Sequence, residues 1–222
     1  MLTSISIQGF KSLEQVEIPL GSVNVFIGAN GSGKSNLLES LGFVSAIADG
    51  RLDDQALARR GVRTSAPPLY RSSFATSQPA AEIRIATRFD TADCQLDYTL
   101  RLPMEVAERE RPWPFTETQL VRDQDSQAVL YERDTGTPGM FAAPPLPAGV
   151  VSDASRLRAE VLADYAVFAP NTPTLRGMVA DITQRVPVGL AGGQLAEAVQ
   201  ELLTFEQFGD LELDRLLAVS YT

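Results

Sequence analysis

The chain has 222 residues, a formal net charge of −9 and an isoelectric point near 4.6. Its hydrophobic content of 44% is ordinary for a globular protein that buries a core. The acidic balance argues against a surface that coats nucleic acid in general, although it leaves room for a local basic patch. One cysteine and no histidine exclude an internal disulfide and histidine-based catalysis within this chain.

Three strands are predicted in the first 27 residues. Polar and apolar side chains alternate from Leu2 to Phe10, which predicts a half-buried strand and carries no basic stretch typical of a signal peptide. A second strand is expected at residues 16–20. A third, at residues 23–27, is more continuously apolar, so we expect it to be central in a sheet.

Residues 28–35 read GANGSGKS and fit the pattern G-x-x-x-x-G-K-[ST] at every fixed position. An apolar strand candidate precedes them and a helix-period pattern follows, which is the context that the pattern requires. Glycines let backbone N–H groups approach phosphate oxygens, while Lys34 would reach the β- and γ-phosphates and Ser35 would ligate Mg²⁺. The predicted nucleotide-binding residues are Gly28, Ala29, Asn30, Gly31, Ser32, Gly33, Lys34, Ser35 and Asn36.

The segments IxIxGFKS at residues 5–12 and NVFIGANGSGKSNLLESL at residues 24–41 resemble the N-terminal lobe of the SMC/RecF/OLD-like branch of ABC-type ATPases. Bacterial AAA-family ATPases from repair or phage-defence contexts look similar. The resemblance is strong over residues 2–45 and diffuse afterwards. It implies ATP as the nucleotide, with Mg²⁺.

The same resemblance suggests further nucleotide contacts. It places Lys11 and Ser12, in the first hairpin turn, near the nucleotide, and a solvated turn lysine is the alternative. It also implies an arginine that reaches back to the phosphates, for which Arg59, Arg60 and Arg63 are the candidates. Basic residues that stabilise a helix C-terminus are the alternative for these arginines.

Beyond the loop, apolar residues at helical spacing predict a helix from Lys34 to about residue 48 and a shorter one at residues 52–61. The period then changes from 3.6 to 2. Alternating runs at residues 82–89, 94–102, 115–121 and 128–133 predict an antiparallel meander of four strands. Arginines on its polar faces alternate with acidic residues, which favours a mixed solvated surface over a ligand patch.

The last third of the chain is expected to be a proline-rich loop at residues 134–151, a helix at 155–165 and a helix that starts at Leu195. Asn171 stands where the resemblance would place a glutamine, and a turn asparagine is the favoured interpretation. Residues 190–194, LAGGQ, look like the LSGGQ signature of ABC-type ATPases, although Ala191 lacks the hydroxyl. A glycine-rich lead-in to a helix is the alternative.

Hydrolysis at such a loop needs an acidic second ligand for Mg²⁺, and the resemblance implies a catalytic glutamate beside it and a switch histidine. Residues 211–222 offer Glu212 and Asp214, but no apolar strand that ends in Asp-Glu, so the catalytic residues are unknown. We therefore expect the N-terminal portion of a head. A fragment is favoured over completion by a second polypeptide or a protein that only binds.

The predicted fold is α/β, a P-loop NTPase of the ABC/SMC-like head type with an N-terminal β-hairpin and an inserted antiparallel β-sheet. We expect a nucleotide-binding core at residues 1–63, an antiparallel β subdomain with a Pro/Gly-rich loop at 64–151, and a helical segment at 152–222.

The predicted function is a cytoplasmic ATPase that hydrolyses ATP when the head is completed and dimerised, in DNA repair or phage defence. The resemblance implies a homodimer or a partner chain that completes the ATP site. DNA is a partner by family analogy only, and no membrane contact is expected. The alternative is a nucleotide-sensing interaction module that binds ATP without turnover.

Overall fold

The computed structural model describes residues 1–48, 52–72, 82–90, 94–103, 113–123, 128–134, 162, 164–182, 185 and 187–204. Most of the loop predicted at 134–151, most of the helix predicted at 155–165, and all of residues 205–222 lie outside these ranges. The chain forms two compact units, Met1–Val167 and Phe168–Thr222. The predicted division at residues 63 and 151 stays a prediction.

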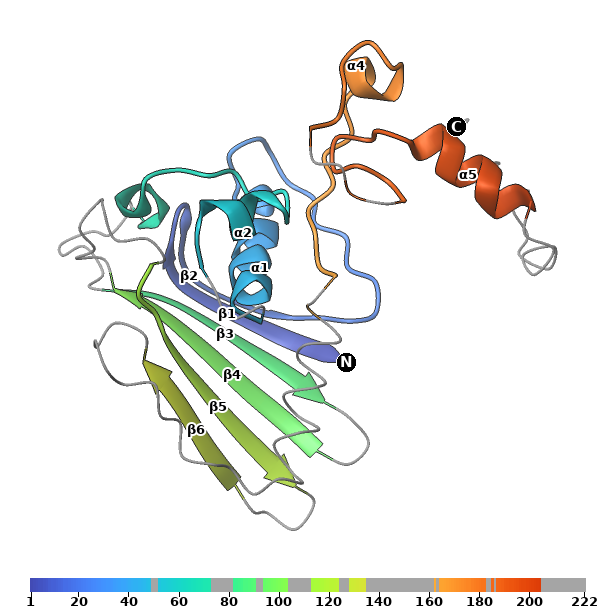
Figure 1. The fold of residues 1–222 in the computed structure, drawn as a ribbon. Helices are drawn as coiled ribbons and strands as arrows, with labels where there is room; N and C mark the ends of the chain where they lie inside the picture. Colours follow the sequence, from blue (N-terminus) through green and yellow to red (C-terminus); the bar gives the residue numbers. More distant parts are fainter. Residues whose placement is uncertain are drawn as a thin grey trace. The chain divides into compact units, whose positions relative to one another are not determined.

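A six-stranded antiparallel sheet organises the first unit (Figure 1), with the strand order β2-β1-β3-β4-β5-β6. The predicted hairpin and the predicted meander are both present, but they form one continuous sheet, since β1 pairs with both β2 and β3. Ile7 of β1, for example, lies opposite Val16 on one side and Ile85 on the other. The strands are β1 (Leu2–Phe10), β2 (Leu13–Pro19), β3 (Glu82–Asp90), β4 (Cys94–Pro103), β5 (Thr116–Asp123) and β6 (Ala128–Asp134).

Alternation along the strands divides the sheet into a buried and an exposed face. Ile83 and Ile85 of β3 are fully buried, whereas Arg84 between them is exposed. On the exposed face, Arg88 Nε donates a hydrogen bond to Asp97 Oδ1 at 2.6 Å, across the β3–β4 pair. This cross-strand ion pair supports the interpretation of the polar face as a mixed, solvated surface.

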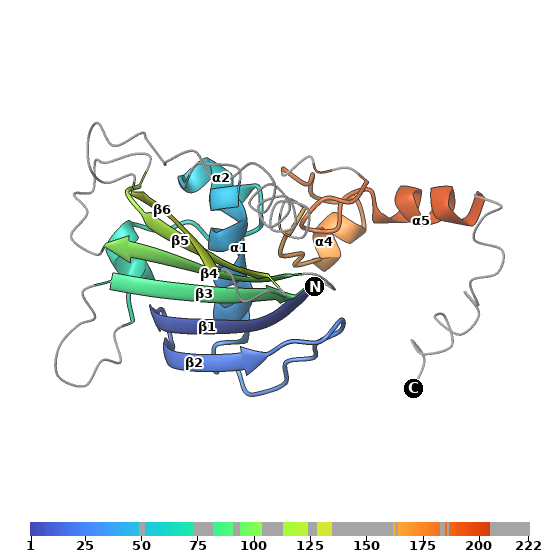
Figure 2. The same cartoon turned by 90° about the horizontal axis from the view of Figure 1, so that it is seen from below.

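Helix α1 (Lys34–Ala48) lies across the buried face of the sheet (Figures 1 and 2) and has the bounds that its apolar spacing predicts. Helix α2 (Asp54–Ala58) is shorter than the helix predicted at residues 52–61. It begins late because the Asp53 side chain accepts from Ala56 N at 2.8 Å, which caps its N-terminus. A short 3₁₀ helix, η1 (Pro67–Tyr70), follows.

Four buried aromatic rings hold α1 to the sheet. Phe43 of α1 meets Phe10 of β1 edge-on, with ring centroids 5.2 Å apart, and meets Tyr70 of η1 at 5.0 Å. Trp113, just before β5, lies 6.0 Å from Phe43. Edge-to-face pairs of this kind add to the burial of apolar area. The cluster therefore joins α1 to segments that are far apart in the sequence.

The central strand predicted at residues 23–27 is wrong for this structure, because this segment is not in a strand. Val23, Val25 and Ile27 are 83%, 81% and 89% exposed, and only Phe26 packs partly against the core. A strand needs a hydrogen-bonded neighbour. Both sides of β1 are already paired, and no strand among the described residues lies beside this segment.

The second unit contains two described helices, α4 (Thr172–Leu175) and α5 (Leu195–Thr204). α5 starts at Leu195, as predicted. The Asn171 side chain caps α4 by accepting from Thr174 N at 3.1 Å, so it serves as the turn asparagine that its neighbours indicate. In the described part of the chain, no helix has the length and apolar character needed to cross a membrane.

The aromatic cluster predicts a large loss of stability in Phe43→Ala. We expect the free energy of unfolding to fall by about 3–5 kcal/mol, because a fully buried ring leaves a cavity. Urea unfolding followed by far-ultraviolet circular dichroism measures it. Val25→Ala serves as the control, since that side chain is exposed and its loss should cost less than about 0.5 kcal/mol. Equal effects of the two changes would contradict the assigned packing.

Burial of Tyr70 predicts a loss of stability at high pH. Its pKa is raised by burial from 10.0 to about 12, so the unfolded chain loses this proton first. The stability contributed by protonated Tyr70 is complete below pH 10 and is lost as the pH rises towards about 12. Tyr70→Phe should flatten this part of the stability profile, measured by urea unfolding between about pH 8 and pH 11. An unchanged slope would contradict the burial.

Candidate nucleotide-binding site

The loop of residues 28–35 joins the exposed segment 23–27 to α1. Two of its glycines have left-handed backbone angles, with φ of 84° at Gly31 and 96° at Gly33, a conformation that glycine adopts without steric cost. Gly33 also has no room for a side chain, because a Cβ there would lie 2.8 Å from Leu13 Cδ2 and 3.0 Å from Ser12 Oγ. The loop therefore lies directly against the β1–β2 turn.

Lys34 places its ammonium within this loop. Its Nζ donates to the carbonyl oxygens of Gly28 and Ala29, each at 2.8 Å, and lies 3.4 Å from Ser32 Oγ. The loop thus curls around one positive charge at the N-terminus of α1, where the helix dipole is also positive. Both features favour an anion, and phosphate is the anion that suits this type of loop.

Ser35 follows in the first turn of α1 and is exposed. A hydroxyl in this position is the ligand type that P-loop proteins use for Mg²⁺. Among the described residues, no group of three or more His, Cys, Asp or Glu side chains could hold a metal ion by itself. The residues present therefore fit a Mg²⁺ ion that arrives with a nucleotide, with Ser35 as its ligand from this part of the chain.

Two predicted contacts and one missed residue meet beside the loop. Lys11, whose φ is 49°, forms an ion pair through Nζ with Glu39 Oε2, and Arg63 Nε donates to Glu39 Oε1. Asn36 links this group to the turn, since its Nδ2 donates to Ser12 Oγ at 2.7 Å. The Glu39 carboxylate raises the pKa of Arg63 above its ordinary value, through a hydrogen bond and charge attraction.

Glu39 was not predicted from the sequence. It is 2% exposed and lies on α1 between the buried residues Leu37 and Leu41. A carboxylate placed among core positions is costly to bury without a cation. That position, together with Lys11 in the turn, is the signal that could have revealed the pair.

The other two candidate arginines lie in different environments. Arg60 is buried, and its guanidinium donates to Ser45 Oγ at 2.6 Å and to the Ala56 carbonyl oxygen at 3.0 Å. These bonds direct it into the core between α1 and α2. Arg59 is exposed at the end of α2. Of the three arginines, the structure connects Arg63 to the start of α1, through Asn36.

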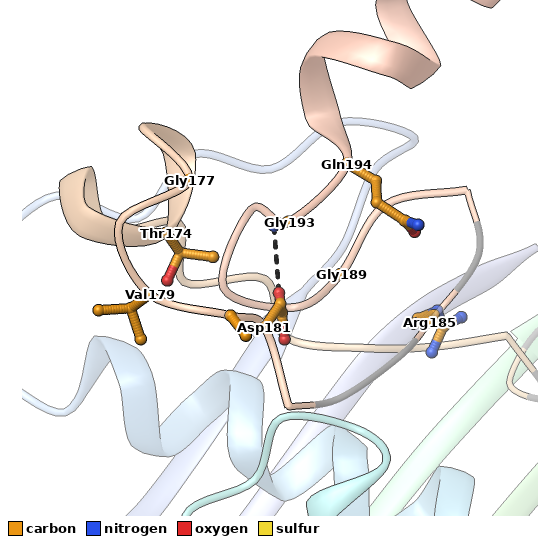
Figure 3. A pocket seen from close by; sticks show the side chains of 9 residues that line it. Thr174, Gly177, Val179, Asp181, Arg185, Gly189, Gly193 and Gln194 are labelled. Atoms are coloured by element: carbon orange, nitrogen blue, oxygen red, sulfur yellow. Dashed lines mark hydrogen bonds between the residues drawn. The ribbon is translucent and has the colours of Figure 1, made fainter.

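In the second unit, the glycine-rich residues 190–194 form a tight loop that enters α5. Gly192 has φ of 93° and Gln194 has φ of 63°. The Asp181 carboxylate accepts from Ala191 N at 2.8 Å and from Gly193 N at 3.1 Å (Figure 3). A pocket of about 630 Å³ lies beside these residues, with Arg185 on its wall. The loop is therefore an anion-holding turn that already holds an internal carboxylate.

Comparisons with known proteins agree with the N-terminal resemblance. A family model described as AAA ATPase domain matches residues 1–92. The chain is similar to proteins named "DNA replication and repair protein RecF" from three actinobacterial sources. The match to Leifsonia xyli subsp. xyli is 40% identical over 62 residues, 27% of this chain and 16% of that protein. Renibacterium salmoninarum gives 42% over 62 residues, with the same shares.

The third relative, from Streptomyces avermitilis, is 39% identical over 62 residues, which is 27% of this chain and 17% of that protein. In all three, the match spans less than a fifth of the relative's length. The resemblance to the N-terminal portion of an ATPase head of the RecF group is thus confirmed. It covers the part of the chain that contains the loop and the β1–β2 turn.

The close approach at Gly33 predicts different costs for two glycine substitutions. Gly31→Ala and Gly33→Ala both place a side chain at left-handed φ, but only Gly33 has neighbours within contact distance. We expect Gly33→Ala to lower the free energy of unfolding by about 1–3 kcal/mol more than Gly31→Ala. Urea unfolding of the two variants measures the difference. Equal losses would show that the loop does not rest on the turn.

Proposed function

We propose that this chain is part of an ATPase head that binds ATP and Mg²⁺ at residues 28–36. The observation that carries the proposal is the loop around Lys34, with its two left-handed glycines at the start of α1. Backbone N–H groups of such a loop cradle phosphates, and the lysine neutralises them. On nucleotide binding, Lys34 would exchange its two carbonyl partners for phosphate oxygens, and Ser35 would ligate Mg²⁺.

Residues of the turn and of the segment after α2 extend the proposed site. Lys11 and Arg63 bring two positive charges next to the start of α1, and Ser12 is in contact with Gly33. Arg63 is the arginine that we propose as a phosphate contact, because its side chain is 67% exposed and bonded to Asn36. Arg60 would need to leave its buried bonds to take this role.

Hydrolysis, dimerisation and coupling to DNA are further parts of the proposal. They are supported by the match to the AAA ATPase domain and by the names of the relatives, which act in DNA replication and repair. We propose a cytoplasmic protein whose ATP site is completed by further polypeptide, as a homodimer or with a partner chain. The net charge of −9 confines a DNA contact to a local surface.

The exposed segment before the loop supports completion by further polypeptide. Val23, Val25 and Ile27 are each more than four-fifths exposed, and they alternate as the residues of a strand do. β-Branched side chains at this spacing suit a pleated, buried surface. A strand paired with this segment would bury all three and would stiffen the backbone that leads into the phosphate loop.

Binding without turnover is the alternative function. A nucleotide-sensing module would use the same loop and would signal to a partner through bound ATP alone. Steady-state release of phosphate, measured on this chain and on any longer natural form, separates the two. Turnover that disappears in Lys34→Ala supports the ATPase. Tight ATP binding with no turnover in either form supports the sensor.

The position of Lys34 predicts the size of its effect on nucleotide affinity. We expect Lys34→Ala to weaken ATP binding by about 10- to 100-fold, because one or two charge-assisted hydrogen bonds are lost. Titration with a fluorescent ATP analogue in the presence of Mg²⁺ measures the dissociation constant. Arg101→Ala is the matched control, since it removes a cation from the polar face of the sheet. Equal affinities of Lys34→Ala and the unmodified chain would refute the site.

A further inference from the structure

Glu39 is a buried carboxylate on α1, one helical turn beyond Ser35. It is 2% exposed, and it forms ion pairs with Lys11 Nζ and Arg63 Nε on its two oxygens. A buried charge needs partners of this kind, and removal of either partner would leave the other buried charge poorly compensated. The carboxylate therefore fixes two cations from different segments at one point beside the phosphate loop.

Arg63 is fixed at several points along its length. Tyr70 Oη donates to its carbonyl oxygen at 2.8 Å, which holds the backbone. Glu39 holds Nε, and one terminal nitrogen donates to Asn36 Oδ1 at 3.2 Å. Because the side chain is 67% exposed, the guanidinium stands at the surface next to the first turn of α1. An arginine held this way loses little conformational freedom when it binds an anion.

Lys11 is held by the same group. Its backbone N donates to the Tyr70 carbonyl oxygen at 2.7 Å, and its ammonium lies 4.7 Å from the centre of the Tyr70 ring. The Lys11 side chain is 15% exposed, so it is more deeply set than Arg63. Lys11 thus neutralises Glu39 from within, and Arg63 is the cation of the pair that can reach an incoming anion.

We propose that Glu39 is a positioning residue for nucleotide binding, which holds the Arg63 guanidinium in place to contact the phosphates at the loop. The inference rests on the proposed function and goes beyond it by assigning a role to a carboxylate that touches no phosphate itself. Simple electrostatics predicts the opposite effect, since a negative charge near the loop would repel a nucleotide. The sign of the effect of Glu39 therefore distinguishes positioning from repulsion.

The test is a double-mutant cycle on nucleotide affinity. Dissociation constants for the N-methylanthraniloyl derivative of ATP with Mg²⁺ are measured for the unmodified chain, Glu39→Gln, Arg63→Ala and the double variant. We expect each single change to weaken binding by about 5- to 10-fold, which corresponds to one charge-assisted contact made less well. The double variant should bind as Arg63→Ala does, because Glu39 then has nothing to position.

Controls separate this inference from the proposed function. Asp97→Asn removes a carboxylate from the surface pair with Arg88 and should leave the affinity unchanged. Urea unfolding of each variant checks that the fold is retained. If Glu39→Gln fails to fold, Arg63→Ala decides alone, since an unchanged affinity there overturns the inference.

Three results would overturn it. One is an equal or tighter affinity in folded Glu39→Gln, and another is an additive loss in the double variant, as expected for a purely structural role. Both leave the proposed function intact while Lys34→Ala still weakens binding. The third is an unmodified chain that binds no nucleotide, which overturns the proposed function together with this inference.

Discussion

The packing of α1 against the buried face of the sheet is the contact on which the rest of the first unit depends. Phe43 in the middle of the helix is enclosed by rings from β1, η1 and the segment before β5. Because a helix is stiff, this enclosure also decides where its first turn stands. The phosphate loop ends in that first turn, so the position of the candidate site follows from the aromatic core.

A second constraint acts at the other side of the loop. The β1–β2 turn approaches Gly33 so closely that no side chain fits between them. The turn is itself tied to η1 by the bond from Lys11 N to the Tyr70 carbonyl oxygen. The buried Glu39 then draws the side chains of Lys11 and Arg63 to α1. Core packing and one buried carboxylate thus hold the same small region from two directions.

The two glycine-rich loops of the chain hold opposite charges. The loop at residues 28–35 encloses the ammonium of Lys34, whereas the loop at residues 190–194 encloses the carboxylate of Asp181. Carbonyl oxygens face inward in the former and N–H groups face inward in the latter. A side chain of the chain itself fills each loop, and a nucleotide at the first loop would have to compete with the two carbonyl bonds of Lys34.

Much of this protein could be read from its sequence alone. The residues of the phosphate loop, the bounds of α1 and the four alternating strands of the meander all follow from local patterns, because spacing and glycine content act within a few residues. The start of α5 at Leu195 was equally readable.

Tertiary structure decided the rest. It joined the hairpin and the meander into one sheet, since pairing of β1 with β3 depends on residues that are far apart in the chain. It left residues 23–27 without the strand that their apolar pattern predicts, because a strand exists only beside a partner. It also separated the three candidate arginines, burying Arg60 against Ser45 and bonding Arg63 to Glu39. Local pattern specifies which residues can bind phosphate, whereas long-range packing specifies which charges stand beside them.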